Sequence, residues 1–107
     1  MASQPKPLGK LQKEKACCMH SKNLTALDRE HLARVKELPC SVCDAAAPSE
    51  AHHVEQGLHY TCVALCVDCH RGHNGWHGTK ALWRIRKMDE LDALNVTVKR
   101  LFELTHP

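Results

Sequence analysis

Large aromatic side chains are scarce in this chain of 107 residues, which contains one Phe, one Tyr and two Trp. Aromatic side chains bury more apolar area than most others, so their scarcity excludes a large, self-sufficient hydrophobic core. A single small domain with so modest a core commonly needs an additional staple. A bound metal ion is the staple that best suits the rest of the sequence.

The sequence also lacks a long hydrophobic run. Its longest wholly apolar stretch, residues 62–67, is far shorter than the roughly 20 residues that a membrane-spanning helix needs. The first residues, Met-Ala-Ser-Gln-Pro, lack the apolar segment of a secretory signal. We therefore predict a soluble, cytoplasmic protein with no membrane contact.

The net charge of +3 is unevenly distributed. Residues 1–23 carry five Lys against one Glu, so the rest of the chain is slightly acidic. We predict a basic, disordered tail over residues 1–23 and a folded domain over residues 24–107. A second basic cluster, with no acidic neighbour within residues 79–87, consists of Lys80, Arg84, Arg86 and Lys87. Both regions can contact phosphates, although a solvated tail and a solvated helix face would give the same pattern.

The pattern of apolar residues and turn formers predicts an α+β chain. The expected elements are a helix over residues 25–38, strands over 51–54 and 60–65, and helices over 79–87 and 89–104. Thr25, Thr79 and Asp89 are the expected N-caps, and Asp28 would complete a capping box in the first helix. An apolar stripe on the last helix is expected to pack into the core; it consists of Leu91, Leu94, Val98, Leu101 and Phe102.

Four of the seven cysteines form two Cys-x-x-Cys pairs, Cys40 with Cys43 and Cys66 with Cys69. Each pair can present two sulfurs to one ion at about 2.3 Å, so the four thiolates are predicted to hold a structural Zn²⁺. A disulfide framework is the alternative, but the cysteine count is odd and the spacing is that of metal-binding knuckles. A closed site of this kind serves folding rather than chemistry.

Histidine gathers around the second cysteine pair, with six of the nine His residues between positions 52 and 77. Adjacent residues on a strand point to opposite faces, so His52 and His53 cannot both enter one core. Imidazoles beside a complete set of four thiolates are surplus to that zinc and predict a second metal site with open positions. Further candidates follow the second cysteine pair: His70, His73, Asn74 and His77. The alternative is that these are ordinary surface or core residues.

Together these motifs resemble the HNH, or ββα-metal (His-Me finger), endonuclease superfamily. Its pattern is a His-bearing strand, a second strand, and then Leu-Cys-x-x-Cys-His at the start of a helix. Residues 51–54 (Ala-His-His-Val) and 65–70 (Leu-Cys-Val-Asp-Cys-His) match it. Residues 38–43 and 75–78 make the chain similar to small phage-encoded HNH proteins and to the recombination enhancement function nucleases, which act with a RecA filament. The resemblance covers residues 31–104 and implies a small ββα-metal core flanked by N- and C-terminal helices.

The resemblance implies a role for each matching residue. In an adjacent pair such as His52-His53, the first residue binds the catalytic metal and the second is the general base. His53 would thus take a proton from the attacking water. His52 and His70 would hold a divalent cation, Mg²⁺ or another, that stabilises charge at the scissile phosphate. The candidates for a third ligand or a phosphate contact are His77, which we favour, His73 and Asn74.

The chain departs from the superfamily at one position. The middle Asn, which helps to orient the base, should fall between the two strands or near the second one. Residues 54–65 contain no Asn. We expect His59 or a backbone carbonyl to take its place.

The resemblance therefore implies a metal-dependent DNA endonuclease, phage-derived and acting in recombination or DNA processing in the cytoplasm of a bacterial host cell. Its basic cluster would contact backbone phosphates, which positions DNA without reading its sequence. The expected partners are DNA and a recombinase filament or another phage or host DNA-processing protein. The alternatives are a non-catalytic zinc module that binds nucleic acid or a protein, and a structural zinc domain whose last helix forms a dimer surface.

Overall fold

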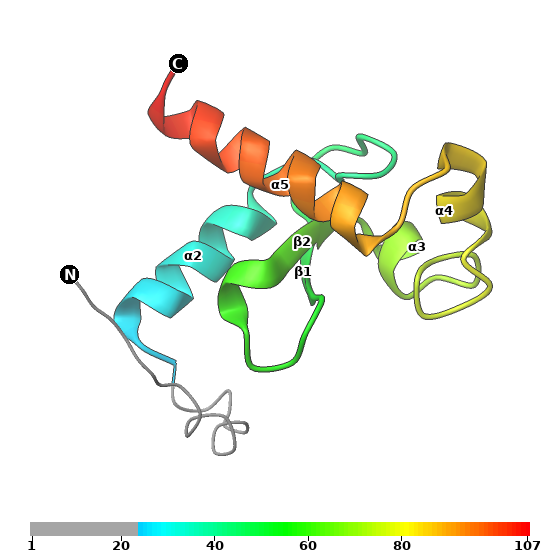
Figure 1. The fold of residues 1–107 in the computed structure, drawn as a ribbon, viewed down its shortest axis with the longest axis horizontal. Helices are drawn as coiled ribbons and strands as arrows, with labels where there is room; N and C mark the ends of the chain where they lie inside the picture. Colours follow the sequence, from blue (N-terminus) through cyan, green and yellow to red (C-terminus); the bar gives the residue numbers. More distant parts are fainter. Residues whose placement is uncertain (1–23) are drawn as a thin grey trace.

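The computed structural model describes residues 24–107, which form an α+β arrangement around a two-stranded antiparallel sheet (Figure 1). The elements, in chain order, are α2 (Ala26–Lys36), β1 (Glu50–His53), the 3₁₀ helix η2 (His59–Thr61), β2 (Cys62–Leu65), α3 (Val67–His70), α4 (Ala81–Arg86) and α5 (Glu90–Thr105). Helices α2 and α5 pack against β2, whereas α3 and α4 lie at the other end of the hairpin from α2 (Figure 1). The predicted basic tail, residues 1–23, lies outside the described residues.

No helix within residues 24–107 has both the length and the apolar character needed to cross a lipid bilayer.

The sheet separates two small clusters of buried side chains. All four residues of β2 are buried. Val63 and Leu65 belong to the larger cluster, whereas Cys62 and Ala64 belong to a second cluster beside α2. Alternation along the strand thus divides few apolar residues between two faces. Neither cluster is large, as the scarcity of aromatic residues predicts.

The larger cluster contains Trp83, the largest fully buried side chain among the described residues. Its indole N–H donates to the carbonyl of Cys69 at 2.8 Å, and its ring meets Trp76 edge-on at a centroid distance of 4.7 Å. A buried indole N–H needs such a partner. Trp83 therefore ties α4 to α3, the helix that carries the second cysteine pair.

Two of the three predicted helix caps are present. A capping box stands at the start of α2, as predicted from Thr25 and Asp28, and Asp89 caps α5 as predicted, with Asp92 completing a second capping box. The prediction that Thr79 caps α4 is wrong, because Lys80 occupies the cap position with φ of 65°. This left-handed residue turns the chain sharply into the helix, and the Thr79 hydroxyl accepts from the Ala81 N–H at 3.2 Å.

Both predicted strands exist, with shifted bounds. β1 covers residues 50–53 rather than 51–54, and β2 begins at Cys62 rather than at Tyr60. Residues 59–61 form η2 instead, because the N–H of Thr61 donates to the carbonyl of Leu58 at 3.1 Å and its hydroxyl to the same carbonyl at 2.8 Å. The β-forming composition of this segment did not reveal the local turn.

The apolar stripe of α5 packs into the core only in part: Leu94 and Leu101 are half-buried against the two clusters, as predicted. Ala93 and Thr97 are the buried residues of this helix, and their small side chains let it lie close to β2. Leu91, Val98 and Phe102 are instead 72%, 51% and 59% exposed. The side of α5 that faces the core is therefore offset from the stripe that hydrophobicity alone indicated.

The Thr97 hydroxyl is the buried polar link between α5 and the centre of the fold. It forms a hydrogen bond with the Ser41 hydroxyl, with the two oxygens 2.7 Å apart, and accepts from the Ala64 N–H at 3.3 Å. We predict that Thr97→Val, which keeps the shape but strands these partners, lowers the free energy of unfolding by about 1–3 kcal/mol. Urea denaturation of the zinc-loaded protein measures this loss.

Thr97→Ser is the matched control, since it keeps the hydroxyl and removes one methyl group. We expect it to cost about 1 kcal/mol. If Thr97→Val were as stable as the parent, the hydroxyl network would contribute nothing.

Candidate metal centres

The four paired cysteines come together at one point of the fold. The ligand atoms of Cys40, Cys43, Cys66 and Cys69 all lie within 4.8 Å of one another, and Cys43 Sγ lies 3.7 Å from Cys66 Sγ. A tetrahedral ion with Zn–S bonds of about 2.3 Å would hold its sulfurs about 3.8 Å apart. This cluster, hereafter the four-cysteine centre, can therefore hold a zinc ion with little rearrangement.

Local backbone geometry presents the sulfurs. The first pair lies in the loop after α2, where the N–H of Val42 donates to Cys40 Sγ at 3.4 Å. The second pair belongs to α3, where Cys66 is the N-cap and its Sγ accepts from the Cys69 N–H at 3.4 Å. N–H groups that point at sulfur favour the thiolate, which is the form that binds metal.

The thiols need a cation in order to ionise together. Burial raises the pKa of both Cys66 and Cys69 above the ordinary value. At Cys40 burial also acts to raise the pKa, but hydrogen bonds from neighbouring backbone N–H groups outweigh it and lower the pKa. Because a bound cation stabilises thiolates, zinc binding would release protons and weaken as the pH falls.

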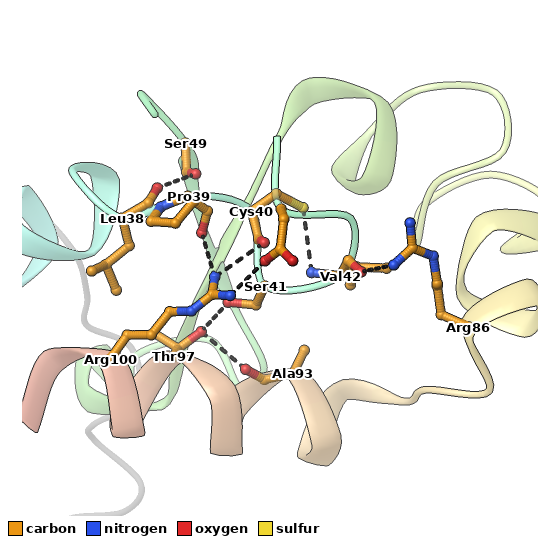
Figure 2. Close-up of polar contacts among 11 residues, drawn as sticks. Leu38, Pro39, Cys40, Ser41, Val42, Ser49, Arg86, Ala93, Thr97 and Arg100 are labelled. Atoms are coloured by element: carbon orange, nitrogen blue, oxygen red, sulfur yellow. Dashed lines mark hydrogen bonds and ion pairs between the residues drawn. The ribbon is translucent and has the colours of Figure 1, made fainter. Parts of the chain in front are cut away.

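Two helices hold the first cysteine pair in place (Figure 2). Arg100 on α5 donates to the carbonyl of Cys40 at 3.3 Å and forms an ion pair with Asp44. Arg86, the last residue of α4, donates to the carbonyl of Val42 at 3.1 Å. The cysteine loop is thus fastened by arginines from two separate elements, and their positive charge suits a centre of four thiolates.

A second cluster, hereafter the three-histidine centre, is built from imidazoles. The ligand atoms of His52, His70 and His77 lie within 4.8 Å of one another. These residues come from β1, from the end of α3 and from the loop that follows α3. His52 is 5% exposed, whereas His77 lies at the surface. Three imidazoles that reach the surface can hold a divalent cation and leave positions open to water or a substrate.

The two rivals of His77 have other surroundings. Asn74 stabilises the loop before α4. Its side-chain oxygen accepts from the Thr79 hydroxyl at 3.0 Å, and its carbonyl accepts from the Leu82 N–H at 3.0 Å. His73 lies outside the cluster. The structure therefore brings His77, and neither rival, together with the other two imidazoles.

Glycines let the loop after α3 return to the three-histidine centre. A Cβ atom on Gly75 would lie 2.4 Å from the carbonyl oxygen of Asp68, and Gly78 is equally confined. Gly75 thus packs on the backbone of α3 and Gly78 on the backbone of residues 72 and 73 of the loop itself, and the N–H of His77 donates to the carbonyl of His70 at 3.0 Å. This bond sets His77 beside its fellow ligand.

Two carboxylates that we did not predict support the imidazoles. Glu90 Oε2 lies 2.6 Å from His52 Nε2, and Glu50 Oε1 lies 2.8 Å from His70 Nδ1. A carboxylate on one ring nitrogen orients an imidazole and leaves the other nitrogen for a metal. Glu50 precedes His52 by two residues on the same strand face, so its spacing was a usable signal. Glu90 is remote in sequence and offers no such signal.

The charge states at the three-histidine centre suit metal binding. Hydrogen bonds from Arg71 and then from His70 lower the pKa of Glu50 to about 2, so it is ionised at neutral pH. Burial lowers the pKa of His52, while the hydrogen bond to Glu90 acts in the opposite direction. The neutral imidazole that results is the form that coordinates metal.

His53 follows His52 in β1 and so belongs to the opposite face of the strand. Its Nε2 lies 3.1 Å from Nδ1 of His59, a residue of η2. Burial and the adjacent His59 and His52 lower the pKa of His53, which keeps its imidazole neutral at neutral pH. His53 is therefore a half-buried imidazole with one nitrogen held by a second imidazole.

Two of the four residues in the predicted phosphate-binding cluster already make contacts within the protein, and the other two are exposed. Lys80 lies over the ring of Trp76, with Nζ 4.6 Å from the centroid, and Arg86 is engaged with the first cysteine pair. Arg84 and Lys87 are exposed at the end of α4. The prediction that this cluster contacts DNA therefore depends mostly on the latter two residues.

Comparison with protein-family models, with curated proteins and with solved structures finds no match to this chain. The side-chain chemistry of the two centres is thus the basis for a functional assignment.

We predict that Cys69→Ser abolishes stoichiometric zinc binding and unfolds the domain, because one ligand of a closed site cannot be replaced by a hydroxyl. Zinc content by mass spectrometry and far-UV circular dichroism measure the two effects. Cys62→Ala is the matched control, since Cys62 is buried but lies outside the four-cysteine centre. It should keep its zinc, and loss of zinc in both variants would contradict the assignment.

We further predict that Glu90→Gln weakens divalent-cation binding at the three-histidine centre by about 10–100-fold, because the neutral amide no longer raises the basicity of His52. Calorimetric titration of the zinc-loaded protein with Mn²⁺ measures this affinity. His77→Ala should lose more, whereas His73→Ala should bind as the parent does. Equal binding by all four proteins would mean that the three-histidine centre holds no cation.

Proposed function

We propose that this protein is a metal-dependent DNA endonuclease of the HNH, or ββα-metal, type. The observation that carries the proposal is a centre of three imidazoles with one at the surface, built across β1, α3 and the following loop beside the four-cysteine centre. A closed set of thiolates supports folding, whereas open imidazoles are suited to hydrolysis. The order of a hairpin followed by a His-bearing helix is the order that the sequence resemblance implies.

The residues of the three-histidine centre fit a divalent cation. His52, His70 and His77 would hold it, with Glu90 and Glu50 orienting two of the rings. When bound, such a cation neutralises charge on a phosphate oxygen and on the departing oxygen. The three neutral donors leave its positive charge undiminished for that purpose.

His53 is the proposed general base. If its Nε2–H donates to His59 Nδ1, then Nδ1 of His53 carries the free lone pair and can accept a proton from the attacking water. Its lowered pKa keeps that nitrogen unprotonated at neutral pH. In this arrangement His59 takes the place of the middle Asn that the chain lacks, holding the base in one tautomer and one orientation.

The proposed substrate is the DNA backbone. Arg84 and Lys87, with Lys80 and Arg86 beside them, would contact phosphates without reading bases. Weak sequence preference follows, so targeting would come from DNA structure or from a partner such as a recombinase filament. A phage-derived enzyme of this kind would work in the cytoplasm of a bacterial host cell.

Nicking of supercoiled plasmid by the zinc-loaded protein, with Mg²⁺, Mn²⁺ or EDTA, tests the proposal. We predict metal-dependent nicking that falls by about 10²–10⁴-fold in His53→Ala, the range that a general base supplies. His106→Ala, an exposed His at the C-terminus of α5, is the control and should cleave as the parent does. Cleavage that His53→Ala leaves unchanged would remove His53 from the mechanism. No cleavage with any metal would favour a zinc module that only binds.

The same assay tests whether His59 positions the proposed base, His53. His59→Ala should lower kcat by about 10²-fold with KM unchanged, because a misplaced base loses its alignment. His59→Asn, which restores a side-chain amide, should recover most of that loss. Equal rates in all three proteins would show that His59 does not position the base.

A further inference from the structure

The exposed side of α5 carries a line of four residues, hereafter the seam. Leu91, Asn95, Val98 and Phe102 follow one another at intervals of four, three and four residues, which is the spacing of one helix of a coiled coil. All four lie at the surface, and a groove runs along the helix between its first three members. Exposed apolar surface that is contiguous, rather than scattered, marks an interaction site.

The opposite side of the helix packs against the rest of the protein. Ala93 and Thr97 are buried against the fold, and Arg100 is engaged with the first cysteine pair. Helix α5 is therefore held in a fixed orientation with the seam turned outward. Figure 1 shows its C-terminal half extending past the hairpin.

We propose that the seam of α5 pairs in antiparallel fashion with the same seam of a second copy of this chain. In that arrangement Leu91 of one copy lies opposite Phe102 of the other, and Asn95 lies opposite Val98, so the large apolar side chains at the two ends of the seam face each other. The two-fold axis crosses the helices between residues 96 and 97. A two-fold contact uses the same surface on both subunits, as one seam requires.

Charges beside the seam select this partner and this direction. Asp92 and Lys99 flank the seam on one side, seven residues apart, and both are exposed. Antiparallel pairing sets Asp92 of each copy beside Lys99 of the other, which forms two opposite-charge pairs. Parallel pairing would not bring Asp92 beside Lys99 of the partner, because the two residues lie seven positions apart along the helix. The chain thus supplies both halves of a complementary surface.

The contact is small. A helix of 16 residues is about 24 Å long, and one helix pair of this length buries less than the roughly 1,200 Å² at which stable interfaces begin. We therefore expect a dimer that dissociates on dilution. Its detection needs no nuclease activity, so its failure and the failure of the proposed function are distinguishable.

Sedimentation equilibrium of the full-length, zinc-loaded chain over a wide concentration range tests the proposal. We expect a reversible monomer–dimer equilibrium, and Val98→Glu should weaken it by more than about tenfold, which is about 1.4 kcal/mol. Leu27→Glu, at a similarly exposed apolar residue on α2, should leave it unchanged. A chain that stays monomeric at every concentration would overturn the proposal, as would a dimer that Val98→Glu leaves intact.

A charge variant tests the direction of pairing and does not depend on how well Val98→Glu folds. Lys99→Glu places like charges together at both pairs and should weaken the dimer, whereas Lys99→Gln should weaken it less. Adding Asp92→Asn to Lys99→Glu removes the repulsion while keeping an acceptor for the Asp89 N–H, and should recover affinity. No recovery in the double variant would contradict the antiparallel arrangement.

Discussion

Four cysteine sulfurs converge on one point, and a zinc ion held there would fix the second half of the hairpin and the helix that follows it in place. Helix α3 supplies the second pair and is only four residues long. A helix of one turn does not form on its own, because nucleation is unfavourable. The hydrogen bond from Trp83 stabilises it, and a metal ion bound at the four-cysteine centre would stabilise it further. His70 ends this helix, so the geometry of the three-histidine centre would depend on that ion.

The hairpin divides the candidate chemistry between two faces. On one face of β1, Glu50 and His52 meet the residues of the three-histidine centre. On the other, His53 meets His59. The pleat of a single strand thus places His52, the proposed metal ligand, and His53, the proposed base, next to each other in sequence but in separate environments. Burial lowers the pKa of both imidazoles, which suits one for coordination and the other for accepting a proton.

Helix α5 connects features that are far apart in the chain. Its first residue, Glu90, contacts His52, and its later turns hold the first cysteine loop through Thr97 and Arg100. Its outward side carries the seam. A second copy bound there would contact the helix that supports both candidate centres, so the proposed dimerisation and metal binding would share one element.

Local spacing was enough to identify the candidate ligands and most helix starts. The two Cys-x-x-Cys pairs and the adjacent His residues are short-range patterns, and so are the capping boxes at Thr25 and Asp89, because each depends only on nearby backbone geometry. Bounds were less predictable where a short-range turn competed with strand formation, as at η2. The supporting contacts needed the packed fold. That Glu90 reaches His52 across 38 residues depends on how the helices pack on the hairpin.

The orientation of α5 was likewise a matter of packing. The periodicity of apolar residues shows that a helix has an apolar side and a polar side. It does not show which residues of the helix contact the sheet. Small residues at Ala93 and Thr97 allowed the closer approach to β2; Leu94 and Leu101 pack at the margin of the core, and Leu91, Val98 and Phe102 are left outside.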